Sequence, residues 1–207
     1  MHSVLRELRA AGAATVTLAL LCCGAYPLAV FAFGQILFPK QANGSLLIDP
    51  DGTIRGSELL GQNFAGPEYF HPRPSAAGPQ GYDATSSGGS NLGPTSRALF
   101  HAIQDRIERY RAENSLPSTT PIPADAVTTS ASGLDPHISL RNADIQSDRV
   151  ARARGRPRHE VQKLIQAHLE SSSDPLRLAP PRINVLLLNR TLDAATKPAK
   201  PSLARDL

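Results

Sequence analysis

The chain has 207 residues and carries 22 lysine and arginine residues against 18 aspartate and glutamate residues, a formal net charge of +4. This length corresponds to one domain with an additional segment, and the near balance of charges argues against a nucleic-acid partner. The only cysteines, Cys22 and Cys23, are adjacent. Their spacing excludes both a disulfide scaffold and a zinc site built from separated cysteine pairs.

The first predicted element is a membrane-spanning helix over residues 10–38. Residues 10–39 contain no lysine, arginine, histidine, aspartate or glutamate, and a helix needs about 20 apolar residues to cross a hydrocarbon core of about 30 Å. Pro27 lies near the middle of the run, where a membrane helix tolerates a kink. A cleaved signal peptide is the alternative, but its apolar region would be only about 7–15 residues long. We therefore expect an uncleaved anchor.

The charges before the span predict its orientation. Arg6 and Arg9 precede the apolar run, and basic flanks remain on the cytoplasmic side of a membrane. We therefore expect residues 1–9 to be cytoplasmic and residues 40–193 to form an extracytoplasmic domain. Residues 194–207 have the composition of a flexible tail.

The first part of this domain is predicted to contain a hairpin and a long helix. Two short strands, residues 45–48 and 53–55, flank the turn sequence Asp49–Gly52. Residues 56–94 are rich in glycine, serine and proline, which indicates an irregular region or a loop. A helix is expected over residues 96–113. Its apolar stripe, expected in the core, comprises Leu99, Ile103, Ile107 and Tyr110.

The second part of the domain contains both helical and strand patterns. Residues 126–131 favour a strand, and residues 146–154 and 157–170 favour two helices interrupted at Gly155. Residues 183–188, Ile-Asn-Val-Leu-Leu-Leu, are predicted to form a central strand. Because helices and strands do not alternate regularly, the fold class is α+β: one amino-terminal transmembrane helix followed by a small mixed domain.

No pattern in the chain indicates catalytic or metal-binding chemistry. The six histidines lack the spacing of a metal site, and no G-x-S-x-G motif is present. The glycine-rich stretch before the long helix lacks the lysine of a phosphate-binding loop. A basic cluster can bind phosphate or anionic lipid headgroups, but a solvated helix face is the favoured interpretation. The cluster comprises Arg149, Arg152, Arg154, Arg156 and Arg158.

Many short phrases follow one another in a fixed order between residues 20 and 193. They include Tyr26-Pro27-Leu28, Phe38-Pro39-Lys40-Gln41-Ala42-Asn43-Gly44-Ser45-Leu46, Gly61-Gln62-Asn63-Phe64, Tyr69-Phe70-His71, Arg73-Pro74-Ser75-Ala76, Ser87-Gly88-Gly89-Ser90-Asn91-Leu92, Ser130-Ala131-Ser132-Gly133-Leu134-Asp135 and Leu188-Asn189. Together they closely resemble the C subunit of the Kdp-type, ATP-driven potassium pumps of bacteria and archaea.

The resemblance implies an accessory role in an inner-membrane complex. In that complex a channel-like subunit takes up potassium, a P-type ATPase subunit hydrolyses ATP, and a very small hydrophobic subunit completes the assembly. The C subunit stabilises the complex and assists ATP use, while ATP and potassium are used by the complex and this chain holds no cofactor of its own. The chain lacks the D-K-T-G-T phosphorylation motif, which agrees with a non-catalytic role. A stand-alone, membrane-anchored periplasmic binding or envelope module is the alternative.

The resemblance also implies two sets of functional residues. Nucleotide contact is expected at Ser87, Gly88, Gly89, Ser90 and Asn91. Subunit contact is expected at Tyr26, Pro27, Gly34, Gln62, Asn63, His71 and Arg73, and small residues such as Gly34 permit close packing between membrane helices. The predicted topology places the nucleotide set outside the cytoplasm, where ATP is scarce. We therefore expect any effect on ATP use to be indirect.

Overall fold

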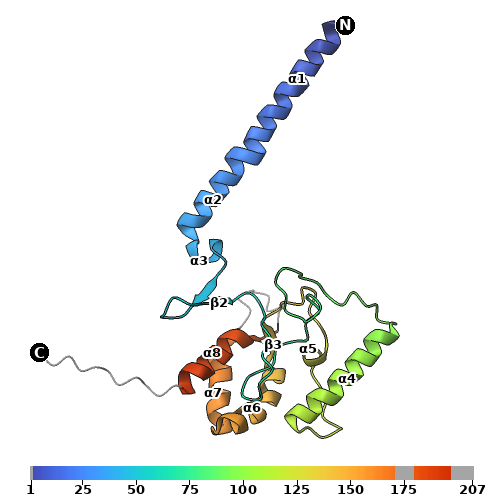
Figure 1. Ribbon diagram of the computed structural model, residues 1–207, viewed down its shortest axis with the longest axis vertical. Helices are drawn as coiled ribbons and strands as arrows, with labels where there is room; N and C mark the ends of the chain where they lie inside the picture. Colours follow the sequence, from blue (N-terminus) through green and yellow to red (C-terminus); the bar gives the residue numbers. More distant parts are fainter. Residues whose placement is uncertain (1, 171–179, 197–207) are drawn as a thin grey trace, which may run out of the picture. The chain divides into compact units, whose positions relative to one another are not determined.

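The computed structural model of the protein describes residues 2–170 and 180–196. The chain divides into two compact units, the first ending at Ser57 and the second beginning at Glu58. The first unit is a long helix followed by a small hairpin, and the second is a mixed α and β domain (Figure 1). The predicted fold class is therefore confirmed.

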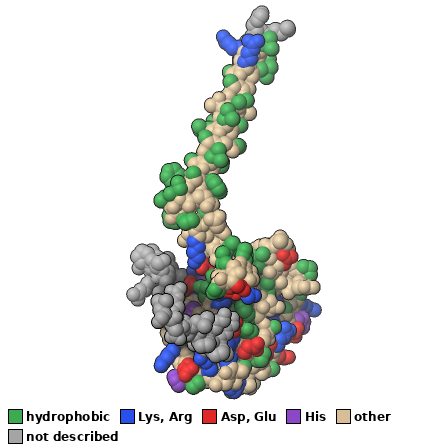
Figure 2. All heavy atoms as spheres, turned by 60° about the vertical axis from the view of Figure 1, so that its left-hand side comes forward, with side chains coloured by type: hydrophobic (Ala, Val, Ile, Leu, Met, Phe, Trp, Pro, Cys, Tyr) green, Lys and Arg blue, Asp and Glu red, His purple; other side chains and the backbone are tan. Residues whose placement is uncertain are grey.

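The amino-terminal helix consists of three consecutive segments, α1 (His2–Ala19), the π-helical turn η1 (Leu20–Ala25) and α2 (Tyr26–Leu37). Residues Ser3–Leu37 are long and apolar enough to cross a membrane, and an 18-residue window within them has a mean hydropathy of 2.1. Figure 2 shows hydrophobic side chains along the helix and basic ones at its amino end. The π turn precedes Pro27, which lacks a backbone N–H, and there the Tyr26 amide donates to Leu21 O. The wider turn thus accommodates the proline without breaking the helix.

The predicted hairpin follows this helix. A short helix, α3 (Pro39–Ala42), leads into β1 (Leu46–Ile48) and β2 (Ile54–Ser57), which pair antiparallel with a register shift after Leu47. Gly52 adopts a positive φ of 83° in the connecting turn, a conformation that glycine adopts without steric cost.

The second unit begins with an irregular stretch, residues 58–96, which contains no helix or strand. The helix predicted next is α4 (Arg97–Asn114), and the side chain of Ser96 accepts a hydrogen bond from the Leu99 amide at its amino end. Tyr110 is buried, but Leu99, Ile103 and Ile107 are only half-buried. The apolar stripe of α4 therefore belongs to the core only at its carboxyl end.

The remaining elements surround a three-stranded antiparallel sheet of order β3-β5-β4. The strands are β3 (His137–Ser139), β4 (Leu169–Glu170) and β5 (Arg182–Asn184), and the helices are α5 (Ala124–Val127), α6 (Leu140–Arg154), α7 (Arg158–Ala167) and α8 (Val185–Thr196). The core consists of Phe70, Ile138, Ala143, Val150, Ala151, Val161, Ile165, Ile183, Val185, Leu188 and Leu192. Segments far apart in the sequence thus share one core.

Four predictions for this region need correction. The helix predicted over residues 157–170 ends at Ala167, and Leu169–Glu170 form the strand β4. Residues 126–131 are not a strand, because residues 124–127 form a helical turn that starts after Pro123. The predicted break at Gly155 is confirmed, with a positive φ of 61°, but α6 begins earlier, at the Ser139 cap. The strand predicted over residues 183–188 is central but ends at Asn184, whose side chain accepts from the Leu187 amide and begins α8.

The predicted tail is described only at its start. Residues 194–196 complete α8, so the helix continues beyond the expected boundary. The other residues assigned to the tail, 197–207, lie outside the described part of the chain.

Candidate functional site

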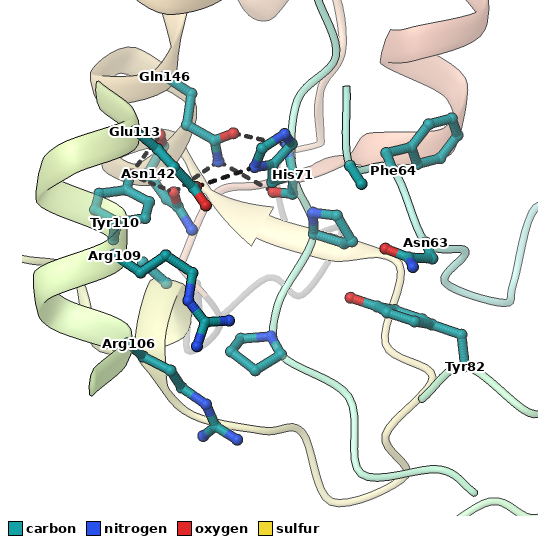
Figure 3. A pocket seen from close by; sticks show the side chains of 14 residues that line it. Asn63, Phe64, His71, Tyr82, Arg106, Arg109, Tyr110, Glu113, Asn142 and Gln146 are labelled. Atoms are coloured by element: carbon teal, nitrogen blue, oxygen red, sulfur yellow. Dashed lines mark hydrogen bonds and ion pairs between the residues drawn. The ribbon is translucent and has the colours of Figure 1, made fainter. Parts of the chain in front are cut away.

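A pocket of about 280 Å³ lies between α4 and the irregular segment around His71 (Figure 3). Its lining residues come from four parts of the second unit: α4, α5, α6 and the irregular stretch before α4. They include Arg106, Arg109, Tyr110, Glu113, Asn142, Gln146, Asn63, Phe64, His71 and Tyr82. The pocket is therefore lined by two of the residues predicted to contact other subunits, Asn63 and His71.

The wall around His71 depends on two buried amide side chains. Gln146 accepts a hydrogen bond from the His71 backbone N–H at 2.7 Å and donates to the His71 carbonyl at 3.0 Å. Asn189 likewise accepts a hydrogen bond from the Phe70 backbone N–H and donates to the Phe70 carbonyl, both at 2.9 Å. Each amide group thus replaces the neighbouring strand that an extended segment would have in a sheet. This satisfies backbone groups that would otherwise be buried without partners.

A hydrogen-bonded chain extends from Gln146 towards α4 and α5. Gln146 Nε2 donates to Asn142 Oδ1 at 2.9 Å, and the Tyr110 hydroxyl donates to the same oxygen at 2.7 Å. Asn142 Nδ2 donates to Asp125 Oδ2 at 3.0 Å, and Asp125 also accepts from the backbone N–H of Ser139 at 2.8 Å. Fully satisfied buried networks of this kind hold the surrounding segments in one arrangement.

Arg149 and Arg154 hold the chain just before His71. Arg149 is 6% exposed and donates to the carbonyls of Pro67 and Tyr69 at 2.7 and 2.9 Å. Arg154 donates to the Glu68 carbonyl at 2.7 Å, and its guanidinium lies 5.0 Å from the centre of the Tyr69 ring. The favoured interpretation of the basic cluster as a solvated helix face is therefore wrong for these two arginines.

The outer members of the basic cluster also have partners. Arg158 forms an ion pair with Asp148 at 3.0 Å, and Arg156 approaches Glu160 at 3.9 Å. Arg152 is exposed. The five arginines therefore point to different parts of the domain and do not converge on one anion.

The imidazole of His71 is held between a carbonyl and a carboxylate. Nε2 lies 3.0 Å from the Gly66 carbonyl oxygen, and Nδ1 lies 3.4 Å from Glu113 Oε2. Burial lowers the pKa of His71, and the positive charge of Arg149 lowers it further, whereas the Gly66 carbonyl and Glu113 raise it. Both ring nitrogens therefore face oxygens that accept hydrogen bonds.

The mouth of the pocket is basic and aromatic. Arg106 donates to the Val127 carbonyl at 3.1 Å, and Arg109 lies one turn further along α4, facing the same space in Figure 3. Burial lowers the pKa of Arg106, and the charge of Arg109 lowers it further. Burial also raises the pKa of Tyr82 to about 12, so this hydroxyl stays protonated at neutral pH. The two arginines suit contact with a polar or anionic group. His71 and Tyr82 are instead bonded to backbone carbonyls of the domain itself, those of Gly66 and Arg73.

The residues expected to contact nucleotide lie elsewhere in the domain, against the loop 130–133. The Gly88 amide and the Ser87 hydroxyl both donate to the Ser132 carbonyl, at 2.9 and 3.0 Å. A Cβ at Gly89 would lie 3.0 Å from the Ala131 carbonyl oxygen. The glycines therefore permit two loops to approach each other closely. Residues 92–96 separate this stretch from α4, which begins at Arg97.

Arg73 and Ser87 both line a second, more open depression of about 800 Å³. Arg73 Nη1 donates to Asp135 Oδ2 at 3.0 Å, and its Nη2 donates to the Thr129 carbonyl at 3.2 Å. Burial alone would raise the pKa of Asp135, but hydrogen bonds from His137 and Arg73 lower it to about 2. The remaining expected residues of the second unit, Gln62 and Ser90, are half-buried, and Asn91 is exposed with a φ of 52°.

Three expected contact residues lie in the first unit. Tyr26 and Pro27 are exposed on the membrane-capable helix. Gly34 is partly covered by α3, because a Cβ at this position would lie 3.9 Å from the Cβ of Ala42. Among the described residues no group of three or more histidine, cysteine, aspartate or glutamate side chains could hold a metal ion.

Three buried polar residues were not predicted from the sequence: Gln146, Arg149 and Asn189. A signal for them was present in the helical spacing. Gln146 and Arg149 share the face of α6 that carries Ala143 and Val150, and Asn189 follows Leu188 on the buried face of α8.

Comparison with known proteins agrees with the resemblance noted in the sequence, and the match covers almost the whole chain. Residues 8–194 match the family model KdpC, described as K+-transporting ATPase, c chain. The KdpC subunit of the potassium-transporting ATPase of Nitratidesulfovibrio vulgaris is 53% identical over 180 residues, covering 87% of this chain and 90% of that protein. The corresponding subunit of Caulobacter vibrioides is 54% identical over 176 residues, covering 84% and 86%. That of Mycobacterium tuberculosis is 51% identical over 168 residues, covering 81% and 87%. The chain therefore belongs to the KdpC family, the non-catalytic C subunits of potassium-transporting ATPases, and its partners are the other subunits of the Kdp complex.

Proposed function

We propose that this subunit stabilises the assembled pump by bracing the potassium-channel-like subunit outside the cytoplasm, and that it assists ATP use only indirectly. In this proposal residues 1–9 are cytoplasmic, residues 10–38 cross the inner membrane and residues 40–193 are extracytoplasmic. The P-type ATPase subunit and the small hydrophobic subunit are the other partners.

The observation that carries this proposal is one membrane-capable helix, Ser3–Leu37, with a basic amino-terminal flank. Arg6 and Arg9 favour a cytoplasmic amino terminus, and long domains after a span are translocated largely regardless of their charge. With this orientation the second unit is separated from cytoplasmic ATP by the membrane.

The contacts of the Ser87–Asn91 stretch support an indirect effect on ATP. A phosphate-binding loop offers free backbone N–H groups to its ligand. Here the Gly88 N–H is already bonded to the Ser132 carbonyl. This favours a structural use of the glycines, in which they join two loops of the brace.

The proposed subunit contacts divide into two kinds. Asn63 is exposed and lines the pocket beside α4, so we propose that it touches a partner directly. His71 and Arg73 are bonded to other parts of the domain. We propose that they shape the contact surface, together with the neighbouring Gln62. On the spanning helix, Tyr26, Pro27 and Gly34 are the proposed contacts.

Cysteine labelling tests the orientation. The chain has no cysteine except Cys22 and Cys23, so replacing both by alanine provides a clean background. Ser86→Cys and Ser3→Cys, both at exposed positions, then report on opposite sides of the membrane. A membrane-impermeant maleimide added outside the inner membrane should label Ser86→Cys alone. Labelling of Ser3→Cys alone would reverse the proposed topology.

A substitution in the glycine-rich stretch tests the indirect effect on ATP. Asn91→Gly removes the side chain and keeps the positive φ of 52° accessible. We expect the assembled complex to keep its yield, its potassium affinity and its ATP dependence. A raised KM for ATP at normal assembly and normal potassium affinity would contradict the bracing proposal and indicate direct nucleotide contact.

A further inference from the structure

The β1–β2 hairpin has one apolar face that stays exposed within the described chain. Ile48 and Ile54 are register partners, and residues opposite each other in an antiparallel pair share a face. Alternation along β1 places Leu46 on the same side. The exposed fractions of Leu46, Ile48 and Ile54 are 41%, 57% and 60%. Three large aliphatic side chains therefore form a continuous apolar surface.

The opposite face is mixed, because alternation along β1 places the half-buried Leu47 on it together with an ion pair. Asp49 and Arg55 form an ion pair on it, with 2.6 Å between Arg55 Nε and Asp49 Oδ2. An isolated two-stranded hairpin is marginally stable in water and normally needs a surface against which its apolar face can pack. The charged pair suits the side that faces water, so the apolar side is the one that requires a covering surface.

The root of the hairpin is fixed to the end of the spanning helix. The Ser45 backbone N–H donates to the Lys40 carbonyl at 2.9 Å. Between them α3 folds back on α2, and Asn43 Nδ2 donates to Gln35 Oε1 at 3.1 Å. The chain at Asn43 therefore lies beside the last turns of the membrane-capable helix, which ends at Leu37. The hairpin thus starts where the apolar helix leaves the hydrocarbon, without an intervening linker.

We propose that the face formed by Leu46, Ile48 and Ile54 docks into the lipid–water interface next to the spanning helix. The occupant of this surface is the phospholipid bilayer, because the surface is continuous with the end of a membrane-capable helix and carries no charge. An amphipathic segment in this position buries its apolar face roughly 5–10 Å into the boundary between headgroups and acyl chains. The proposal goes beyond the bracing function: it gives the chain a second membrane attachment, and it holds for either orientation of the chain.

The absence of tryptophan from the chain permits a direct test. Ile48→Trp and Ile54→Trp each introduce a single fluorophore on the apolar face. The full chain is reconstituted into vesicles of phosphatidylcholine and phosphatidylglycerol, with and without phosphatidylcholine brominated near the glycerol end of its acyl chains. We expect blue-shifted emission from both variants and strong quenching by the brominated lipid.

Thr53→Trp is the matched control, since Thr53 is exposed and adjacent to Ile54 but outside the apolar face. It corrects for the intrinsic attraction of indole to membranes. Quenching of Ile48→Trp and Ile54→Trp should exceed that of Thr53→Trp several-fold. Equal quenching of all three variants, or blue-shifted emission that bromine leaves unchanged, would overturn the proposal. The latter result would mean that protein rather than lipid covers this face.

Discussion

Replacing Asn189 by alanine tests whether buried amides hold the irregular segment in place. Asn189 and Phe70 are both 0% exposed, and Asn189 bonds the N–H and the carbonyl of Phe70. The substitution leaves both backbone groups buried without these partners. Each unsatisfied group costs roughly 1–3 kcal/mol, so the pair costs about 2–6 kcal/mol. Alanine recovers about 0.7 kcal/mol through its higher helix propensity in α8. We therefore expect the free energy of unfolding to fall by about 1–5 kcal/mol.

The assay is urea unfolding of the full chain in mild detergent, monitored by circular dichroism. Asn63→Ala is the matched control, because Asn63 is exposed, and a substitution there should change stability by no more than about 0.5 kcal/mol. Hydrogen exchange at the Phe70 amide gives an independent readout and should accelerate in Asn189→Ala. If both variants unfold alike and the Phe70 amide remains protected, the amide clamp does not stabilise this segment.

Three further predictions concern pH and backbone geometry. Because burial and the charge of Arg149 lower the pKa of His71 in the folded state, unfolding by urea should become easier as the pH falls below about 6.5; His71→Gln should lessen this dependence. The pKa of Asp135 is lowered to about 2, so its carboxylate stabilises the fold above about pH 4 and loses this effect as the pH falls towards 2. After allowance for the exposure of this side chain, Asp135→Asn should lower the free energy of unfolding by about 1 kcal/mol at pH 7 and leave it unchanged in acid. Gly133→Ala should cost more than Gly155→Ala in the same assay, since both have positive φ but only the former Cβ would meet atoms, at 2.6 Å; equal costs would contradict close loop packing.

The elements with strong local signals could be predicted from the sequence. The uncharged run 10–39 predicts the long helix, and the turn residues 49–52 predict the hairpin. Glycine at position 155 ends α6 where expected. In each case the deciding information lies within one segment, so no knowledge of the tertiary structure is needed.

The prediction was wrong where one segment serves two elements. Residues 183–188 are apolar except for Asn184, and a short, mostly apolar run does not distinguish a buried strand from a buried helix. The side chain of Asn184 decides the outcome by accepting from the Leu187 amide. Helical spacing of Val185, Leu188 and Leu192 then continues the pattern past the run. An asparagine followed by this spacing was the available signal for a helix start.

Helical spacing can mark the buried face on which the buried polar residues lie, but the reason that polar side chains are needed there lies in a different part of the chain. Residues 58–96 form no helix or strand, so their backbone groups lack the regular partners that a helix or sheet would provide. Gln146, Arg149 and Asn189 supply these partners from α6 and α8. Such residues look like surface residues in the sequence, yet each is required by a backbone more than 70 positions away. It follows that substituting them should reduce stability in the manner of core substitutions, and that the irregular segment owes its fixed shape to the helices beside it.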